Sequence, residues 1–148
     1  MYTGADLLVK TVEAMAAGDY PLQDQVGLLA GREPKHAPKI FKEDMKVDWT
    51  LGVDAIFNHI RGLSPFPTAW TEFRNKKNGE VVSLKIFETE RIVKDHGKDV
   101  GLSTDNKTYL DVLVEGGVIR IKELQLSGKK RMKTEEFLRG FHIEDYSL

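Results

Sequence analysis

The chain has 148 residues, of which 41% are hydrophobic and 30% are charged, and its formal net charge is −1 at pH 7. It has no cysteine, which excludes disulfides and thiolate metal sites, and no apolar run approaches the roughly 20 residues that a membrane-spanning helix needs. This length and composition predict one domain with its own hydrophobic core, with room for an appended helix.

The N-terminal part of the chain predicts a helix followed by a linker. Apolar residues recur at helical spacing between Thr3 and Ala17, which predicts an amphipathic helix with Thr3 as its cap and Gly18 as its end. Residues 19–38 contain prolines and glycines that break any regular period, so an extended linker is expected there. The predicted apolar face of the helix consists of Leu7, Leu8, Val12 and Met15.

A second helix is predicted near residues 52–61, where apolar residues again recur at helical spacing. Asp48 and Thr50 are both able to cap its start. Gly62 is the expected C-cap, because glycine adopts the left-handed conformation at little cost. The pattern also places His59 on the polar side of this helix. The apolar face is formed by Val53, Ile56, Phe57 and Ile60.

Beyond this helix the sequence predicts mainly β-strands. Pro65 and Pro67 are expected to hold the chain extended before the first strand. Two hairpin turns, at Asn78-Gly79 and at Glu115-Gly116-Gly117, separate runs that alternate between apolar and polar residues. Residues 95–105 are polar and predict a loop. The predicted strands are 69–74, 81–92, 108–114 and 118–126.

The end of the chain predicts a turn and a short helix. Ser127-Gly128 is the expected turn. Thr134 is expected to cap the helix, and Glu135 and Glu136 fall in its first turn, where carboxylates suit the helix dipole. Several strands at this spacing, with one helix before and one after, predict a mainly β fold with flanking helices that closes, fully or partly, into a small barrel.

One segment of the chain is strongly basic although the whole chain is not. Residues 120–133 contain six basic side chains and one acidic side chain. Gly128 lets the backbone turn directly before Lys129, Lys130 and Arg131, three cations that neighbours in a strand cannot all neutralise. Charge alone favours a solvated basic hairpin turn. Such a patch is nevertheless able to bind a polyanion on a nearly neutral domain.

The sequence contains no recognisable catalytic or metal-binding constellation. Its four histidines are far apart and form no His-x-x-x-His pair. A Gly-x-Ser-x-Gly elbow is absent, and Gly128-Lys129 is followed by lysine rather than by the serine or threonine of a phosphate-binding loop. We therefore expect no catalytic residues and no metal site in this chain.

Three segments, in this order, resemble the methionyl-tRNA formyltransferase family. The first is Ala-Pro-Lys-Ile-Phe-Lys-Glu-Asp at 37–44, ending in Val47-Asp48-Trp49. The second is Arg-Gly-Leu-Ser-Pro-Phe-Pro at 61–67, followed by Ala69-Trp70. The third is Glu-Leu-Gln-Leu-Ser-Gly-Lys-Lys-Arg-Met at 123–132, followed by Glu-Glu-Phe-Leu at 135–138.

The resemblance implies a domain organisation. Residues 1–18 would be the last helix of a Rossmann-like catalytic domain that this chain lacks, and 19–38 would be a linker. Residues 39–148 would be an OB-like C-terminal domain that binds tRNA. The family transfers a formyl group from 10-formyltetrahydrofolate to the α-amine of methionyl initiator tRNA, in the cytoplasm, at the start of translation.

The resemblance also implies that the chain alone is inactive. The folate site and the reacting Asn, His and Asp of the family lie in the N-terminal domain, so Asn58-His59 belongs to a different motif. We expect no cofactor in this chain. The expected partners are the initiator methionyl-tRNA and the missing catalytic domain, with no membrane and no metal.

Six cations are candidates for tRNA contact, because phosphate contacts depend on lysine and arginine. Lys39 and Lys42 lie in the first matched segment, Arg61 opens the second, and the others follow Gly128. Arg61 has an alternative role, since a cation in the last turn of a helix complements its dipole. The candidates are Lys39, Lys42, Arg61, Lys129, Lys130 and Arg131.

Two other functions remain open at this stage. A free-standing OB-like nucleic-acid-binding module would stack bases on exposed aromatic rings, and would need Phe66, Phe73 or Phe87 in the open. The C-terminal domain of another folate-dependent formyltransferase, acting on a sugar or small molecule, would have less need of three adjacent cations.

Overall fold

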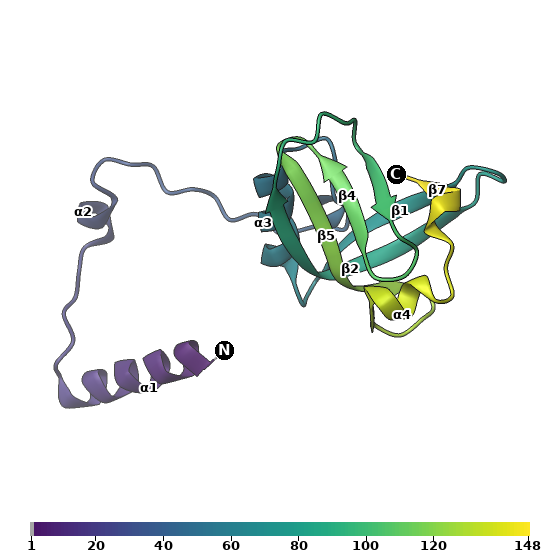
Figure 1. Ribbon diagram of the computed structural model, residues 1–148. Coiled ribbons are helices and arrows are strands. Elements are labelled where there is room, and N and C mark those ends of the chain that lie inside the picture. Colours follow the sequence, from purple (N-terminus) through teal and green to yellow (C-terminus); the bar gives the residue numbers. More distant parts are fainter. Residues whose placement is uncertain (1) are drawn as a thin grey trace. The chain divides into compact units, whose positions relative to one another are not determined.

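The computed structural model describes residues 2–148 (Figure 1). The chain divides into two compact units, the first running to Lys39 and the second from Ile40 to Leu148. No helix among the described residues is long and apolar enough to cross a membrane.

The first unit is helical. The predicted first helix is confirmed, and Gly18, with φ of 72°, follows its last residue. Thr3 lies inside this helix, so its predicted role as the cap is wrong. A short helix that the sequence did not predict interrupts the linker, because the Asp24 carboxylate accepts a hydrogen bond from the Gly27 amide at 3.0 Å and caps it. The two helices are α1 (Tyr2–Ala17) and α2 (Gln25–Leu29).

The second unit is a curved antiparallel sheet flanked by helices, which confirms the expected OB-like barrel (Figure 1). The strand order is β3-β4-β5-β2-β1-β7, with β6 paired to β5. The helical elements are η1 (Glu43–Met45), α3 (Val53–Leu63), α4 (Thr134–Leu138) and η2 (Ile143–Asp145). The strands are β1 (Ala69–Asn75), β2 (Val81–Val93), β3 (Gly101–Thr104), β4 (Leu110–Val114), β5 (Gly117–Leu126), β6 (Met132–Lys133) and β7 (Tyr146–Ser147).

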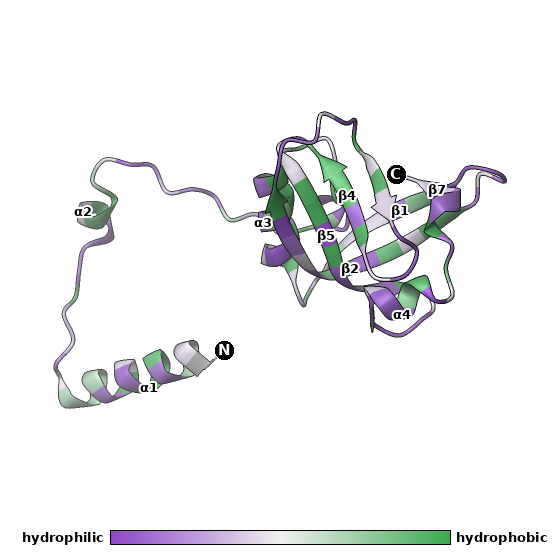
Figure 2. Cartoon of the chain, viewed as in Figure 1, coloured by the Kyte–Doolittle hydropathy of each residue, from purple (hydrophilic) through white to green (hydrophobic). Residues whose placement is uncertain are grey.

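The core lies between α3 and the inner face of the sheet. Successive side chains of a strand point to opposite faces, and Figure 2 shows the resulting alternation of apolar and polar residues along β2. Trp49 is buried in the core, and its indole N–H donates to the buried Thr71 hydroxyl at 2.8 Å. Residues that the sheet contributes to the core include Ala69, Phe73, Leu84, Ile86, Ile119, Ile121 and Leu124.

The start of α3 differs from the prediction. Gly52 occupies the N-cap position, and the free amide of Val53 donates to the carbonyl of Glu115 at 2.9 Å. Asp48 instead accepts hydrogen bonds from the amide and hydroxyl of Thr50, so neither residue caps the helix. A backbone carbonyl in the turn between β4 and β5 thus caps the start of α3, where a side-chain cap was predicted. The same hydrogen bond attaches α3 to the sheet.

The end of α3 also differs. Gly62 is helical rather than left-handed, and Ser64 is the C-cap with φ of −87° and ψ of 142°. The chain then forms a turn through Pro65 and Pro67 rather than an extended segment. This turn is closed by hydrogen bonds, because the Thr68 amide donates to the carbonyl of Leu63 at 2.9 Å.

The conformation of Gly62 gives a stability prediction. A methyl group added at Gly62 would meet no atom within 4 Å. Because alanine is the better helix former, Gly62→Ala is expected to raise the free energy of unfolding by about 1 kcal/mol in urea titration. Gly128→Ala is the matched control, since it has equal space but φ of 76°, and it should lower that free energy. A loss of stability in Gly62→Ala would contradict the helical assignment.

The prediction of a loop over residues 95–105 is wrong in part. Gly101–Thr104 form β3 at the edge of the sheet. This strand has a single large apolar residue, Leu102, and shows no alternation that a sequence pattern could detect. The preceding loop is fixed by His96. Its Nδ1 accepts from the Lys98 amide at 3.1 Å, so Nε2 carries the proton and faces two carbonyl oxygens, those of Val114 and Gly117, at 2.9 and 3.0 Å.

The C-terminal helix α4 starts without the predicted cap. Lys133 occupies the N-cap position, and the buried Thr134 hydroxyl donates to the carbonyl of Ile121 on β5. Thr134 therefore attaches the helix to the sheet instead of capping it. Glu135 and Glu136 occupy the first turn, as predicted.

The loop between β3 and β4 predicts a pH effect on stability. The Asp105 carboxylate accepts hydrogen bonds from the Thr108 hydroxyl and from the amides of Thr108, Lys107 and Tyr109. These bonds, that of the Thr108 hydroxyl first, hold the pKa of Asp105 well below its usual value of 3.8. The carboxylate therefore stabilises the fold above pH 3.8, and this contribution is lost as the pH falls toward the folded-state pKa.

Asp105→Asn is accordingly expected to be less stable than the parent chain at pH 7, because the amide cannot replace every accepted bond. The difference should narrow at pH 3, where the parent carboxylate in the unfolded chain is largely protonated. Urea unfolding at both pH values measures this. An equal difference at the two pH values would show that Asp105 acts without its charge.

Candidate nucleic-acid interface

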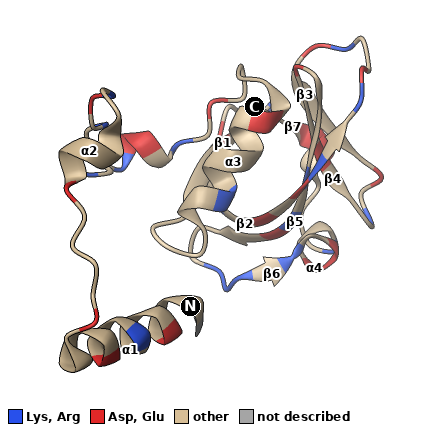
Figure 3. Ribbon diagram, turned by 90° about the vertical axis from the view of Figure 1, so that its left-hand side faces the viewer, with Lys and Arg blue, Asp and Glu red and all other residues tan. Residues whose placement is uncertain are grey.

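The predicted turn at Ser127-Gly128 is present and firmly held. The Ser127 amide donates to the carbonyl of Ser83 on β2 at 3.0 Å, and the Lys129 amide donates to the carbonyl of Leu126 at 2.9 Å. The amide group of Gln125 donates to the Lys129 carbonyl at 2.7 Å. The backbone on both sides of Gly128 is thereby fixed, and the basic segment runs from it into β6 (Figure 3).

The three cations after Gly128 differ in their partners. Lys130 pairs with Glu136 at 3.3 Å, although 78% of its side chain is exposed. Arg131 pairs with Glu123 and lies 4.3 Å from the ring centre of Phe87. Lys129 pairs with no carboxylate among residues 2–148. One full charge at this turn is therefore uncompensated, and a second is only weakly paired in solvent.

Arg131 is held by two partners, Glu123 and Phe87. Its guanidinium stacks on Phe87 while donating to Glu123, and this hydrogen bond lowers the pKa of the Glu123 carboxyl. The side chain remains 44% exposed. A guanidinium held in one orientation loses little entropy on meeting a phosphate, although Glu123 competes for its donors.

A second basic group surrounds Trp70, on the outward face of β1. The ammonium groups of Lys42 and Lys46 lie 5.6 and 5.0 Å from the centre of the Trp70 ring. The indole N–H donates to the carbonyl of Lys42 at 2.9 Å, which attaches η1 to the sheet. Lys46, which the sequence did not single out, also pairs with Glu72 at 2.6 Å.

The remaining two candidates lie elsewhere. Lys39 is exposed and belongs to the first unit, whereas the other five candidates belong to the second. Arg61 lies in the last turn of α3, where its guanidinium donates to Asn58 at 3.1 Å. That position fits the helix-dipole interpretation of Arg61. Lys42 instead precedes η1, and Lys129, Lys130 and Arg131 lie between β5 and β6.

The register of the sheet connects the two basic groups. Trp70 on β1 pairs with Lys85 on β2, and Lys85 pairs with Gln125 on β5. Paired residues point to the same face, so these three side chains form one row across the outward surface. The row begins at the Lys42 and Lys46 group and ends beside the turn that carries Lys129. We call this surface the basic face; it comprises Lys42, Lys46, Trp70, Lys85, Gln125 and residues 127–131.

Lys85 is a member of this surface that the sequence analysis missed. Alternation along β2 is enough to place it outward, opposite the buried Leu84 and Ile86. What a single sequence does not supply is the pairing of three strands, and only that pairing brings Lys85 between Trp70 and Gln125.

Two of the three phenylalanine rings that a base-stacking module was expected to expose are not available for stacking. Phe73 is completely buried, and the half-buried Phe87 is covered by Arg131. Phe66 alone of the three is open, with 87% of its surface exposed. A free-standing base-stacking module thus has one of the rings it would need.

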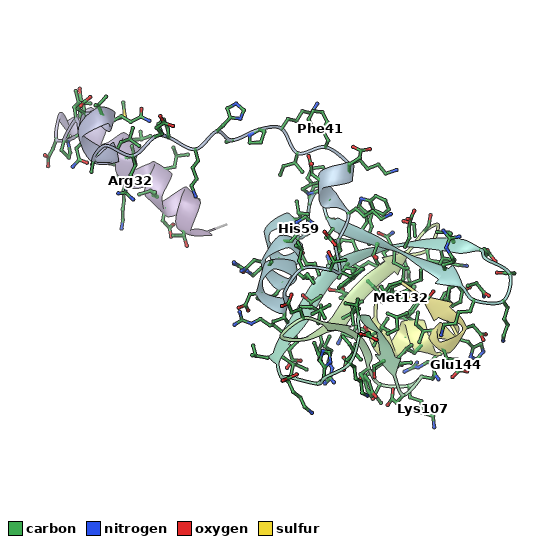
Figure 4. The ribbon with its side chains drawn as sticks, turned by 90° about the horizontal axis from the view of Figure 1, so that it is seen from above. Arg32, Phe41, His59, Lys107, Met132 and Glu144 are labelled. Atoms are coloured by element: carbon green, nitrogen blue, oxygen red, sulfur yellow. The ribbon has the colours of Figure 1, made fainter. Side chains whose placement is uncertain are left out.

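The expectation that His59 lies on the polar side of α3 is wrong. His59 is half-buried, and its Nε2 atom is covered without a hydrogen-bond partner in the described part of the chain (Figure 4). The buried face of α3 extends beyond its four fully buried residues and includes His59 at its border. Within residues 2–148, no three His, Asp or Glu side chains are grouped so that they could hold a metal ion.

Comparison with known proteins gives consistent results. Residues 39–142 match the family described as formyl transferase, C-terminal domain. Methionyl-tRNA formyltransferase of Phocaeicola vulgatus is 45% identical over 147 residues, which cover 98% of this chain and 45% of the relative. The enzyme of the same name from Parabacteroides distasonis is 40% identical over 151 residues, covering the whole chain and 46% of the relative. The chain thus spans about half the length of the curated relatives it matches.

Proposed function

Since the chain belongs to the family of formyl transferase C-terminal domains, we propose that its barrel holds the tRNA substrate of a methionyl-tRNA formyltransferase. Its similarity to enzymes of that name supports the proposal. The substrate would be the initiator methionyl-tRNA, and the site of action the cytoplasm.

The observation that carries the proposal is the basic face. It brings together cations that are far apart in the sequence, from Lys42 to Lys129, on one side of three adjacent strands. Cations that neutralise phosphates release condensed counterions, which gives affinity without reading the base sequence. A rigid sheet is suited to positioning one end of a long nucleic acid.

The chemical role of this chain would be positioning. Holding the acceptor end near the formyl donor converts a bimolecular reaction into an effectively unimolecular one. We assign no reacting group to the chain itself. The two covered polar atoms without partners, His59 Nε2 and Asn106 Oδ1, lie on α3 and after β3 and do not converge, so these residues do not fit a folate site.

We also propose that residues 1–18 complete a Rossmann-like catalytic domain, with 19–38 as the linker and 39–148 as the tRNA-binding domain. The exposed apolar side chains of α1 support this proposal, since Leu7, Leu8 and Val12 each have more than half of their surface exposed. An amphipathic helix normally buries such a face against a partner.

A free-standing nucleic-acid-binding module is the second candidate, favoured by the exposure of Phe66. The two functions differ in what they need. If bases stack on Phe66, Phe66→Ala should lower the affinity for single-stranded RNA. If phosphates bind on the basic face instead, Phe66→Ala should leave the affinity for RNA nearly unchanged.

The proposal is tested by fluorescence anisotropy with labelled initiator methionyl-tRNA and the 148-residue chain. We expect saturable binding at 50 mM KCl that weakens steeply by 200 mM KCl, because phosphate contacts dominate. A complete lack of binding at 50 mM KCl would overturn the proposal.

A further inference from the structure

The basic face contains a hollow that none of the predicted cations lines, and we propose that it is a subsite for a backbone phosphate of the tRNA. Its donors would be the ammonium of Lys85 and the hydroxyls of Ser83 and Ser127. This inference rests on the proposed function, because it names where on the barrel a phosphate of that substrate binds.

The hollow lies on the outward surface where β2 and β5 run into the 127–128 turn. Its volume is about 220 Å³. The hydrogen bond from the Ser127 amide to the Ser83 carbonyl holds the two serines side by side. Within the described range 2–148, no carboxylate lines the hollow. Its lining residues are Ser83, Lys85, Gln125, Leu126, Ser127 and Gly128.

The donors in the hollow are free. Lys85 is exposed and forms no ion pair with any residue from 2 to 148. The hydroxyls of Ser83 and Ser127 likewise have no hydrogen-bond partner within this range. An ammonium and two hydroxyls provide the donors with which proteins hold phosphate oxygens.

A larger hollow on the same sheet is less suitable for phosphate. Its volume is about 350 Å³, and its lining includes the carboxylates of Glu88, Glu123 and Glu135. Arg120, which also lines it, already forms two hydrogen bonds with Asp111 at 2.8 and 2.9 Å. A phosphate there would meet carboxylates and a guanidinium that is already paired, whereas the lining of the hollow at Lys85, as far as residues 2–148 show it, contains neither.

The position of Lys85 makes the basic face continuous. Neighbouring strands lie about 4.8 Å apart, so Lys85 stands roughly 5 Å from the row positions of Trp70 and Gln125 on either side. Glu72 on β1 pairs with Ser83, so its carboxylate is on the same face beside the hollow, where Lys46 pairs with it at 2.6 Å. Cations at Lys42, Lys85 and Lys129 would thus follow one nucleic-acid strand across the sheet.

The test compares Lys85→Ala with Lys107→Ala in the 148-residue chain, with initiator methionyl-tRNA as the probe. Both changes remove one exposed charge that forms no ion pair within residues 2–148, and Lys107 (labelled in Figure 4) lies in the connection between β3 and β4, next to Asn106, which donates to Glu144. Lys85→Ala should weaken binding roughly tenfold at 50 mM salt and reduce the slope of log K against log[salt] by about 0.7–0.9. Lys107→Ala should change neither.

Ser83→Ala combined with Ser127→Ala separates hydrogen bonding from charge. We expect a several-fold loss of affinity with an unchanged salt slope, because no charge is removed. If Lys85→Ala and Lys107→Ala bind tRNA with the same affinity and salt slope while the parent chain binds tRNA, the proposed phosphate subsite is wrong and the proposed function stands. If the parent chain fails to bind tRNA at 50 mM salt, both are wrong.

Discussion

Charge reversal at the basic turn, Lys129→Glu with Lys130→Glu, is expected to weaken tRNA binding roughly 100-fold at 50 mM salt. Each lost phosphate contact costs about tenfold at that salt concentration, and the new carboxylates repel the phosphates. The salt slope should fall by about 1.4–1.8. Lys129→Glu alone should cost at least as much affinity as Lys130→Glu alone, because Lys130 already pairs with Glu136. Anisotropy titration over 50–200 mM KCl measures both quantities.

The matched control is Lys98→Glu with Lys107→Glu. These lysines are also exposed and form no ion pair in the described range, but they lie in the loops on either side of β3. The control changes the net charge by the same amount. An equal loss of affinity in the two double variants would mean that tRNA responds to total charge, and the basic face would have no special role.

Phe73→Ala is expected to lower the free energy of unfolding by about 3–5 kcal/mol, the largest effect on stability that we predict. Phe73 has no exposed surface, and its ring lies in the core between α3 and the sheet. Removing it leaves a cavity that the surrounding strands cannot fill. Urea unfolding followed by circular dichroism measures the change.

Phe66→Ala is the control for this variant. Its ring is 87% exposed, so the same substitution should change the free energy of unfolding by less than about 0.5 kcal/mol. Similar losses in the two variants would show that Phe73 does not lie in the core of this barrel.

The hairpins and the barrel were predictable because their signals are local. Alternation along β1 and β2, and the glycines at positions 79 and 116 with φ of 75° each, identify a strand pair from a few neighbouring residues. The family resemblance added the OB-like closure, which the strand pattern alone allowed in a closed or a partly open form.

The errors arose where distant parts of the chain replace a local signal. Val53 obtains its hydrogen bond from Glu115, 62 positions away, so no capping side chain is needed. β3 exists because β4 pairs with it, and Gly62 stays helical because the turn from Leu63 to Thr68 supplies the stop. Propensity is a weak prior at such positions.

The candidate site was predictable only in part, for the same reason. Three adjacent cations after a glycine are visible in the sequence, and the structure places them beside the row formed by Trp70, Lys85 and Gln125. The partners of those cations, and the presence of Lys85 and Lys46 on the same face, depend on register and packing. The tRNA-binding role of all these residues stays a prediction.

Mapping of amide chemical shifts in the ¹⁵N-labelled chain on addition of initiator methionyl-tRNA tests most directly where the nucleic acid lies. We predict that the largest shifts occur at Trp70, Lys85, Gln125 and residues 127–131, at substoichiometric to equimolar tRNA. Shifts concentrated instead around β3 and η2, or spread evenly over the barrel, would contradict the assignment of the basic face.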